Sequence, residues 1–229
     1  GIVKPDTILT DRDSTQPAWK DTPDKDWQQR RMEVYAAQVE SMDRGIGRVL
    51  DALENLGQLD NTLVFFLSDN GACAEEVFET FYPYEKLAGE GRAKPLTSRT
   101  HTRDGRLMKH GNDPTILPGD ETTFQSYGVA WANLSNTPFR EYKHFVHEGG
   151  IATPLIVHWP NGVSAQGKLR HQTGQLMDIM ATIVDVADVD WPKERDGLSI
   201  LPCEGSSLKD TFESDHVERP PLAWEHEGN

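Results

Sequence analysis

Cysteine is scarce in the sequence, and long hydrophobic runs are absent. The two cysteines, Cys73 and Cys203, form no CxxC pair and no disulfide framework, which excludes a dithiol redox motif and a disulfide scaffold. We expect each to be a small buried or idle thiol rather than a nucleophile. The longest apolar runs have the length of a strand, far short of the roughly 20 residues that a membrane-spanning helix needs. We therefore expect no membrane span.

Positive charge is also scarce. The 229 residues include 23 Lys and Arg against 37 Asp and Glu, a formal net charge of -14 at pH 7, and the isoelectric point is near 4.9. General nucleic-acid binding depends on a basic surface that displaces counterions, so we expect no nucleic-acid partner. An anionic substrate would need a local cationic pocket. The hydrophobic content of 36% fits a globular protein. The length of 229 residues is enough for one sizeable core, or for one domain and part of a second.

The most informative stretch is the apolar run 62–68, which continues directly into Asp69, Asn70 and Gly71. Its β-branched and aromatic residues predict a strand buried on both faces. In open α/β sheets ligands gather outside the carboxyl ends of the strands, which is where a carboxylate and a carboxamide stand here. Gly71 permits a sharp turn that lets both side chains point at one spot. A plain turn explains the three residues equally well on local sequence alone.

Two helices and a second strand are predicted around this stretch. Apolar residues at spacings of three and four predict a long amphipathic helix from Trp27 to Leu53, with Gly57 as its C-cap. Gly45 and Gly47 inside this helix indicate close packing against a sheet. A strand at 154–160 and a helix at 176–187 follow. Helix, turn and buried strand in succession favour an α/β fold with a mainly parallel sheet flanked by helices.

The remaining segments have little apolar periodicity. Residues 1–26 predict an extended connecting loop, and 72–130 a long loop region of the kind that is functional or disordered. Residues 191–221 have the composition of a connection between subdomains. The short apolar piece 222–226 predicts a strand whose partners lie after residue 229. The start at Gly1, without Met, is typical of the middle of a longer chain.

Taken in order, these pieces resemble the sulfatases, the arylsulfatase branch of the alkaline phosphatase superfamily. Three stretches carry the resemblance. The first is the helix, turn, strand and Ser-Asp-Asn-Gly of 35–71, and the second runs from Ser-Asn-Thr-Pro-Phe-Arg at 135–140 through Lys143 to Glu-Gly-Gly-Ile-Ala-Thr-Pro at 148–154. The third is Trp-Glu-His-Glu-Gly-Asn at 224–229. It implies a mixed, mainly parallel, alkaline-phosphatase-like sheet. Residues 1–205 would then be the C-terminal part of the large α/β domain, and 206–229 the linker and start of a small C-terminal antiparallel subdomain.

The resemblance also implies roles for individual residues. Asp69 and Asn70 match two metal ligands that hold calcium, and their oxygen atoms suit calcium, or less well magnesium, better than zinc or copper. Lys143 matches a lysine that contacts the sulfate and its bridging oxygen, as a catalytic and substrate-binding residue. No position of the family requires His144 or His147, but His144 is expected to border the pocket. Asn136 and Arg140 are expected at the pocket edge. Glu148 is expected either in a structural role or behind the residues that contact the substrate, and His147 and His158 in structural roles.

The family's nucleophile, a formylglycine made from Cys or Ser in a Cys/Ser-x-Pro-x-Arg motif, has no counterpart in this sequence. Cys73 is followed by Ala-Glu-Glu and Cys203 by Glu-Gly-Ser. We therefore expect this chain to be the C-terminal portion of a sulfatase, with the end of that sulfatase lying after residue 229. The nucleophile and the other metal ligands would come from an upstream segment, and the chain alone would be inactive.

Two alternatives to a sulfatase follow from the same residues. One is a metal-dependent phosphodiesterase or phosphatase of the same superfamily, although such sites prefer several Asp and His ligands over Asp69 followed by Asn70. The other is a non-catalytic binding protein on the same fold. For the sulfatase, the expected substrate is a small-molecule or carbohydrate sulfate ester, and the family resemblance implies a periplasmic or secreted location. The sequence leaves the oligomeric state open.

Overall fold

The computed structural model describes residues 5–77, 101–226 and 228. The chain forms two compact units, each built from segments that are distant in sequence. Unit 1 comprises Gly1–Arg48, Asn70–Thr153 and Glu225–Asn229, and unit 2 comprises Val49–Asp69 and Pro154–Trp224. The division between a large domain at 1–205 and a small subdomain at 206–229 concerns the longer protein and stays a prediction.

The longest element is helix α1 (Lys25–Asn55), which confirms the predicted amphipathic helix. Gly57 follows it with a φ of 65°, and its N–H donates to the carbonyl of Glu54 at 2.8 Å, as expected of a left-handed C-cap. The packing predicted for Gly45 and Gly47 is wrong. A Cβ at Gly47 would meet open space, and one at Gly45 would touch only the flexible side chain of Arg48, so neither glycine is required by a close contact.

Unit 1 has its buried anchor on the first turns of α1. The Trp27 indole donates to the carbonyl of Ile116 at 2.9 Å, and the Arg31 guanidinium lies 4.4 Å from the Trp27 ring centroid. Arg31 is 7% exposed and forms an ion pair with Glu76 at 3.2 Å. Burial lowers the pKa of Arg31, and Glu76 opposes this shift. The helix is thereby fixed to the segment that follows Gly71.

The long loop region predicted at 72–130 contains regular structure in its described part; residues 78–100 lie outside it. Strand β2 (Lys109–His110) pairs in parallel with β3 (Thr123–Phe124), and helix α3 (Gly128–Asn136) comes next. The sequence does not predict α3 because the helix is short and mostly apolar, with Ala132 completely buried. The other elements of unit 1 are the 3-10 turn η1 (Trp19–Asp21) and the single turn α4 (Glu148–Ile151).

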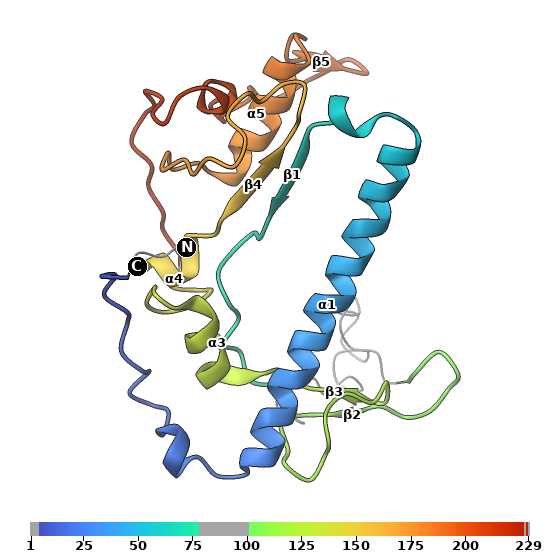
Figure 1. The fold of residues 1–229 in the computed structure, drawn as a ribbon, viewed down its shortest axis with the longest axis vertical. Helices are drawn as coiled ribbons and strands as arrows, with labels where there is room; N and C mark the ends of the chain where they lie inside the picture. Colours follow the sequence, from blue (N-terminus) through green and yellow to red (C-terminus); the bar gives the residue numbers. More distant parts are fainter. Residues whose placement is uncertain (1–4, 78–100, 227, 229) are drawn as a thin grey trace. The chain divides into compact units, whose positions relative to one another are not determined.

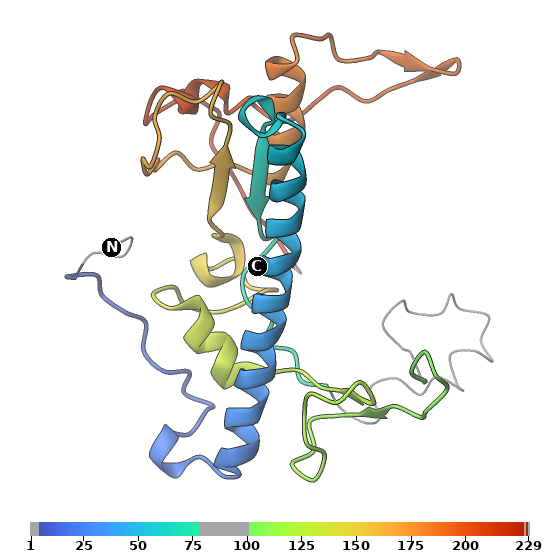
Figure 2. The ribbon, with the colours of Figure 1, turned by 45° about the vertical axis from the view of Figure 1, so that its right-hand side comes forward.

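Unit 2 is built around two strands. The 3-10 turn η2 (Leu59–Asn61) leads into β1 (Val64–Leu67), which pairs antiparallel with β4 (Leu155–His158). Figures 1 and 2 show the two strands side by side. Both predicted strands are confirmed, but burial of β1 on both faces is wrong: the Phe66 side chain is 42% exposed. No third strand joins this pair within the described residues, so the predicted parallel sheet is not observed there.

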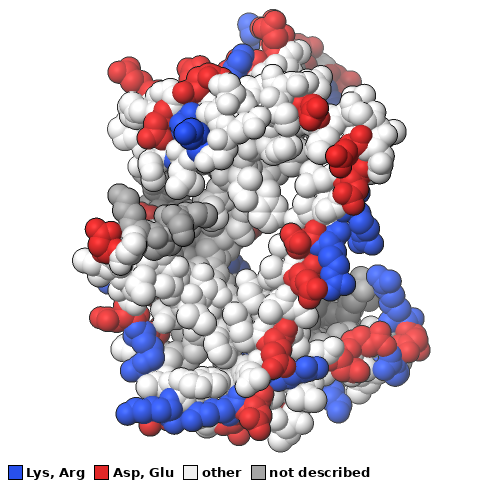
Figure 3. All heavy atoms as spheres, in the orientation of Figure 1, with Lys and Arg blue, Asp and Glu red and all other residues white. Residues whose placement is uncertain are grey.

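The predicted second helix is confirmed as α5 (Leu176–Val186), which contacts the 3-10 turn η3 (Lys209–Phe212). Between them, β5 (Glu194–Arg195) and β6 (Leu198–Ser199) form a short antiparallel pair. The segment 222–226 pairs with no strand in the described part of the chain. Because its expected partners lie after residue 229, that strand stays a prediction. Figure 3 shows acidic and basic side chains interspersed over the face in view.

Candidate active site

Asp69 and Asn70 follow strand β1 directly. Asp69 is exposed and Asn70 half-buried, and neither side chain has a hydrogen-bond or ion-pair partner among the described residues. A free carboxylate and a free carboxamide fit a hard cation, but calcium takes about six to eight oxygen ligands. No group of three or more His, Cys, Asp and Glu in the described residues could hold a metal. The two residues therefore fit as part of a larger ligand set.

Backbone hydrogen bonds join the segment after Asn70 to the segment that carries Lys143. The Gly71 N–H donates to the carbonyl of Gly150 at 3.0 Å, and the Lys143 N–H donates to the carbonyl of Ala72 at 3.1 Å. A Cβ on Gly71 would lie 1.7 Å from the carbonyl oxygen of Gly149, so glycine is required there by close approach. The fold thus brings together two motifs that are about 70 residues apart in sequence.

Asn136 completes this junction from the end of α3. Its carboxamide oxygen accepts from the Ala72 N–H at 2.9 Å, and its NH2 group donates to the carbonyls of Glu141 at 2.8 Å and Gly149 at 2.7 Å. The expectation that Asn136 lies at the pocket edge stays a prediction. What the contacts define is a cross-link between three backbone segments.

The two glycines of the Glu-Gly-Gly motif fit so closely that no side chain has room. A Cβ on Gly149 would lie 2.2 Å from the carbonyl oxygen of Glu141, and one on Gly150 would lie 2.0 Å from that of Phe145. This close approach explains why both positions are glycine, whereas the structural role expected of Glu148 stays a prediction. Both glycines are buried and belong to the helical turn α4.

Lys143 lies in a small cluster of polar side chains, which we call the Glu75 cluster and define as Cys73, Glu75, Lys143, His144 and His226. The Glu75 carboxylate is 3.2 Å from the Lys143 ammonium and 2.9 Å from Nε2 of His144, and it accepts from the Cys73 thiol at 3.1 Å. Nδ1 of His144 lies 3.2 Å from Nε2 of His226. Hydrogen bonds from His144, Cys73 and Lys143 lower the pKa of Glu75 to about 2.

The loop that carries Lys143 has an unusual backbone and a buried anchor. Glu141 and His144 have φ angles of 66° and 81°, a region that residues other than glycine rarely adopt. Between them, the Tyr142 hydroxyl donates to the Asp13 carboxylate at 2.7 Å, and Tyr142 is 4% exposed. Burial, followed by the contact with Asp13, raises the pKa of Tyr142. Asp13 and Tyr142 therefore fix the loop from the N-terminal side.

Three other predicted residues have identifiable surroundings. Burial and the neighbouring Glu75 raise the pKa of the Cys73 thiol, which agrees with its expected lack of reactivity. Arg140 contacts the ring of His147, with its Nη2 2.6 Å from Nε2. Both are exposed, and the pocket-edge role of Arg140 stays a prediction.

Sequence reasoning missed Glu75, Tyr142 and Asp13 as parts of this site. Glu75 stands in the run Cys-Ala-Glu-Glu, and its partner Lys143 is 68 residues away. The only available signal was proximity to the Asp69 and Asn70 pair. Such proximity does not specify a side-chain contact.

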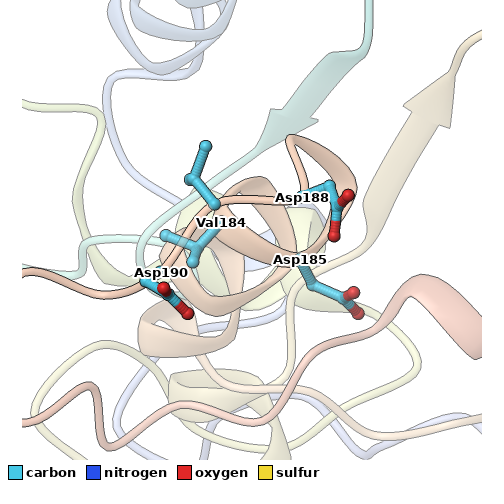
Figure 4. A pocket seen from close by; sticks show the side chains of 5 residues that line it. Val184, Asp185, Asp188 and Asp190 are labelled. Atoms are coloured by element: carbon cyan, nitrogen blue, oxygen red, sulfur yellow. The ribbon is translucent and has the colours of Figure 1, made fainter.

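A separate cavity of about 370 Å³ lies at the C-terminal end of α5 in unit 2. Figure 4 shows Asp185, Asp188 and Asp190 around Val184 at its wall. None of the predicted site residues lines it. Its carboxylates make it unsuited to an anionic sulfate ester.

Comparison with known proteins decides the family. A family model described as Sulfatase matches residues 9–189. The chain belongs to the sulfatase family. The family implies an alkaline-phosphatase-like α/β fold, of which the helices and strands described above are part. None of the described helices combines the length and the apolarity that a membrane crossing requires.

Individual relatives are also sulfatases. An uncharacterized sulfatase of Schizosaccharomyces pombe is 34% identical over 192 residues, which are 83% of this chain and 31% of that protein. An arylsulfatase of Klebsiella aerogenes is 30% identical over 210 residues, 91% of this chain and 40% of that protein. The N-acetylgalactosamine-6-sulfatase of Mus musculus is 29% identical over 170 residues, 73% of this chain and 22% of that protein. The chain thus spans less than half the length of each relative.

Proposed function

We propose that the protein to which this sulfatase chain belongs hydrolyses sulfuric esters as an arylsulfatase-like, calcium-dependent enzyme. Its nucleophile would be a formylglycine in a segment outside these 229 residues. Support comes from the family match over 9–189 and from relatives named arylsulfatase and N-acetylgalactosamine-6-sulfatase. The substrate would be a small-molecule or carbohydrate sulfate ester, and the location periplasmic or secreted.

The observation that carries the proposal is the hydrogen-bonded junction between the two motifs. The Lys143 N–H donates to the carbonyl of Ala72, two residues after Asn70, and Asn136 binds the same segment. The Lys143 loop and the segment that begins at Asn70 are therefore held on one hydrogen-bonded framework. In the proposed reaction the Lys143 ammonium offsets negative charge on the sulfate group and on the leaving oxygen as the ester bond breaks.

Asp69 and Asn70 would hold the metal together with ligands from the rest of the protein. Calcium fits better than magnesium, because magnesium demands near-ideal octahedral geometry and keeps several waters. When bound, the ion would supply positive charge to the sulfate oxygens. His144, beside Lys143, would border the substrate. The remaining strands of a mainly parallel sheet would likewise come from the longer protein.

The test uses the longer protein and 4-nitrophenyl sulfate. Asp69→Asn keeps the shape of the side chain but removes its charge, and Lys143→Gln removes the ammonium. We expect each variant to lower kcat/KM by about a hundredfold or more. Asp69→Asn should also weaken calcium binding measured by titration calorimetry, whereas Lys143→Gln should leave it unchanged.

The same assay distinguishes the alternatives. Hydrolysis of 4-nitrophenyl phosphate or its diester in place of the sulfate would identify a phosphoryl-transfer enzyme. Turnover of none of these esters would favour a binding protein. Undiminished calcium affinity in Asp69→Asn would show that the metal site lies elsewhere.

A further inference from the structure

Glu75 is an acidic residue that contacts the Lys143 ammonium, and neither the family match nor the motifs assign it a role. We propose that Glu75 is a positioning residue of the sulfate site, which holds the side chains of Lys143 and His144 in the orientation that catalysis requires. This inference rests on the proposed function, because it concerns the same site.

The first step of the argument is the geometry of the carboxylate, which uses both of its oxygens. Oε1 lies 2.9 Å from Nε2 of His144, and Oε2 lies 3.2 Å from the Lys143 ammonium. The Cys73 thiol donates to Oε2 at 3.1 Å, which fixes the carboxylate from its own segment. Glu75 therefore links two consecutive residues of the Lys143 loop to the segment that follows Asn70.

The second step is that the backbone and the side chain of Lys143 are held by one short segment. Ala72 accepts from its backbone N–H, and Glu75 contacts its ammonium. A lysine side chain is long and flexible, and a backbone hydrogen bond alone leaves the ammonium free to sample many positions. The Glu75 contact restricts it, so residues 72–75 hold both the backbone and the ammonium of Lys143.

The third step is the strained backbone of His144. Its φ of 81° is unfavourable for a residue with a Cβ. This conformation coincides with a position in which Nε2 contacts Glu75 and Nδ1 contacts His226. Backbone strain of this kind persists where surrounding contacts compensate for it, and the Glu75 carboxylate supplies such a contact.

The charge of Glu75 supports this role. Because its pKa is lowered to about 2, the carboxylate is ionised throughout the range in which an enzyme of this kind would work. The ionised carboxylate therefore attracts the Lys143 ammonium that lies 3.2 Å away. Cys73 is no competing explanation for the cluster, since its raised thiol pKa opposes a nucleophilic role.

The test compares Glu75→Gln with Glu40→Gln in the longer protein, with 4-nitrophenyl sulfate as substrate. Glu40 forms an exposed ion pair with Arg44 on α1 and is a matched control for loss of one carboxylate. We expect Glu75→Gln to lower kcat about tenfold while KM changes less than twofold. A misplaced ammonium reduces stabilisation of the transition state more than it reduces the affinity for substrate. Glu40→Gln should retain wild-type kinetics. Wild-type kinetics in Glu75→Gln would overturn the proposal.

A double-mutant cycle separates positioning from a general structural effect. If Glu75 acts through Lys143, the double variant Glu75→Gln with Lys143→Gln should be no slower than Lys143→Gln alone. If the reductions in kcat caused by the two substitutions instead multiply in the double variant, Glu75 does not act through Lys143.

A second measurement does not depend on turnover. The ammonium signal of Lys143 in a nitrogen–proton NMR correlation spectrum, assigned by its loss in Lys143→Gln, should be present in the wild type and absent or broadened in Glu75→Gln. Retention of the signal would overturn the proposed restraint. If the signal differs between wild type and Glu75→Gln but the wild type hydrolyses no sulfate ester, the proposed function is refuted and the restraint on Lys143 is supported.

Discussion

Asn136 shows how much of the site depends on one neutral side chain. Its carboxamide oxygen accepts from the Ala72 N–H, and its NH2 group donates to the carbonyls of Glu141 and Gly149. Only a carboxamide of this length supplies an acceptor and two donors at once. Substitution by Asp preserves the size and removes both donors.

We therefore predict that Asn136→Asp lowers the free energy of unfolding by roughly 2 kcal/mol at pH 7, because two backbone carbonyls lose their donors and gain a negative neighbour. Urea denaturation followed by circular dichroism measures the change. The control is Asn61→Asp, since Asn61 is exposed and its side chain has no partner in the described residues. Equal unfolding midpoints for the two variants would contradict the prediction.

At the same scale, sequence motifs indicate which residues are candidates for metal and sulfate binding, but not which residues contact them. Asp69, Asn70 and Lys143 stand out in the sequence because they belong to recurring motifs. Glu75 and Tyr142 acquire their roles through contacts with residues 68 and 129 positions away, respectively. No local pattern specifies such contacts.

At the scale of elements, the start of α5 carries a buried polar side chain, Asp178. Asp178 is completely buried and accepts from the backbone N–H of Gln175 at 2.7 Å and of Ser206 at 2.8 Å, and Arg219 contacts it at 2.7 Å. Burial raises the pKa of Asp178, but hydrogen bonds from Arg219 and the two backbone groups outweigh burial and lower it overall. The ionised carboxylate therefore stabilises the folded state.

The sign of the pH dependence follows from this lowered pKa. The contribution of Asp178 is fully present above the pKa of an unfolded aspartate, about 3.9, and is lost as the pH falls through the lower pKa of the folded state. We predict that Asp178→Asn lowers the free energy of unfolding by about 3 kcal/mol at pH 6, because it leaves the largely buried Arg219 charge without its carboxylate partner. The difference from wild type should shrink as the pH falls below about 3.9.

Denaturation midpoints measured between pH 6 and pH 3 test this expectation. Asp190→Asn is the control, because Asp190 is exposed and has no partner among the described residues. A difference between Asp178→Asn and wild type that stays constant over this range would argue against a stabilising ionised Asp178.

The elements also show which local signals were sufficient. Helices α1 and α5 and strands β1 and β4 were predicted from apolar periodicity and flanking turn residues. Helix α3 was missed because its apolar residues form no one-sided stripe. The strand expected at 222–226 had the right composition but has no pairing strand in the described structure. A strand needs such a partner, whereas a helix satisfies its hydrogen bonds internally.

At the scale of the whole molecule, the two units leave many large apolar side chains accessible. In unit 2 these include Phe66, Leu155, Ile156, Met177 and Met180. The sequence predicted that β1 would be buried, and its composition is that of a buried strand. Burial depends on neighbouring layers, which a strand's own sequence does not supply.

We predict that the purified 229-residue chain does not hydrolyse 4-nitrophenyl sulfate, because neither cysteine lies in a Cys/Ser-x-Pro-x-Arg motif. Release of 4-nitrophenolate above the rate in buffer would be measured, with the longer protein as the positive control. Robust turnover by the 229 residues alone would refute the assignment of the nucleophile to another segment.

The sequence by itself determined the family, the main helices and strands, and the candidate ligands Asp69 and Asn70, because motifs and periodicity are local properties of the chain. Only the tertiary structure decided that β1 and β4 pair antiparallel, that Asn136 joins three segments, and that Glu75 meets Lys143. The physical reason is the same in each case. These contacts depend on how distant segments approach one another, and the approach is set by packing and hydrogen bonding across the whole fold.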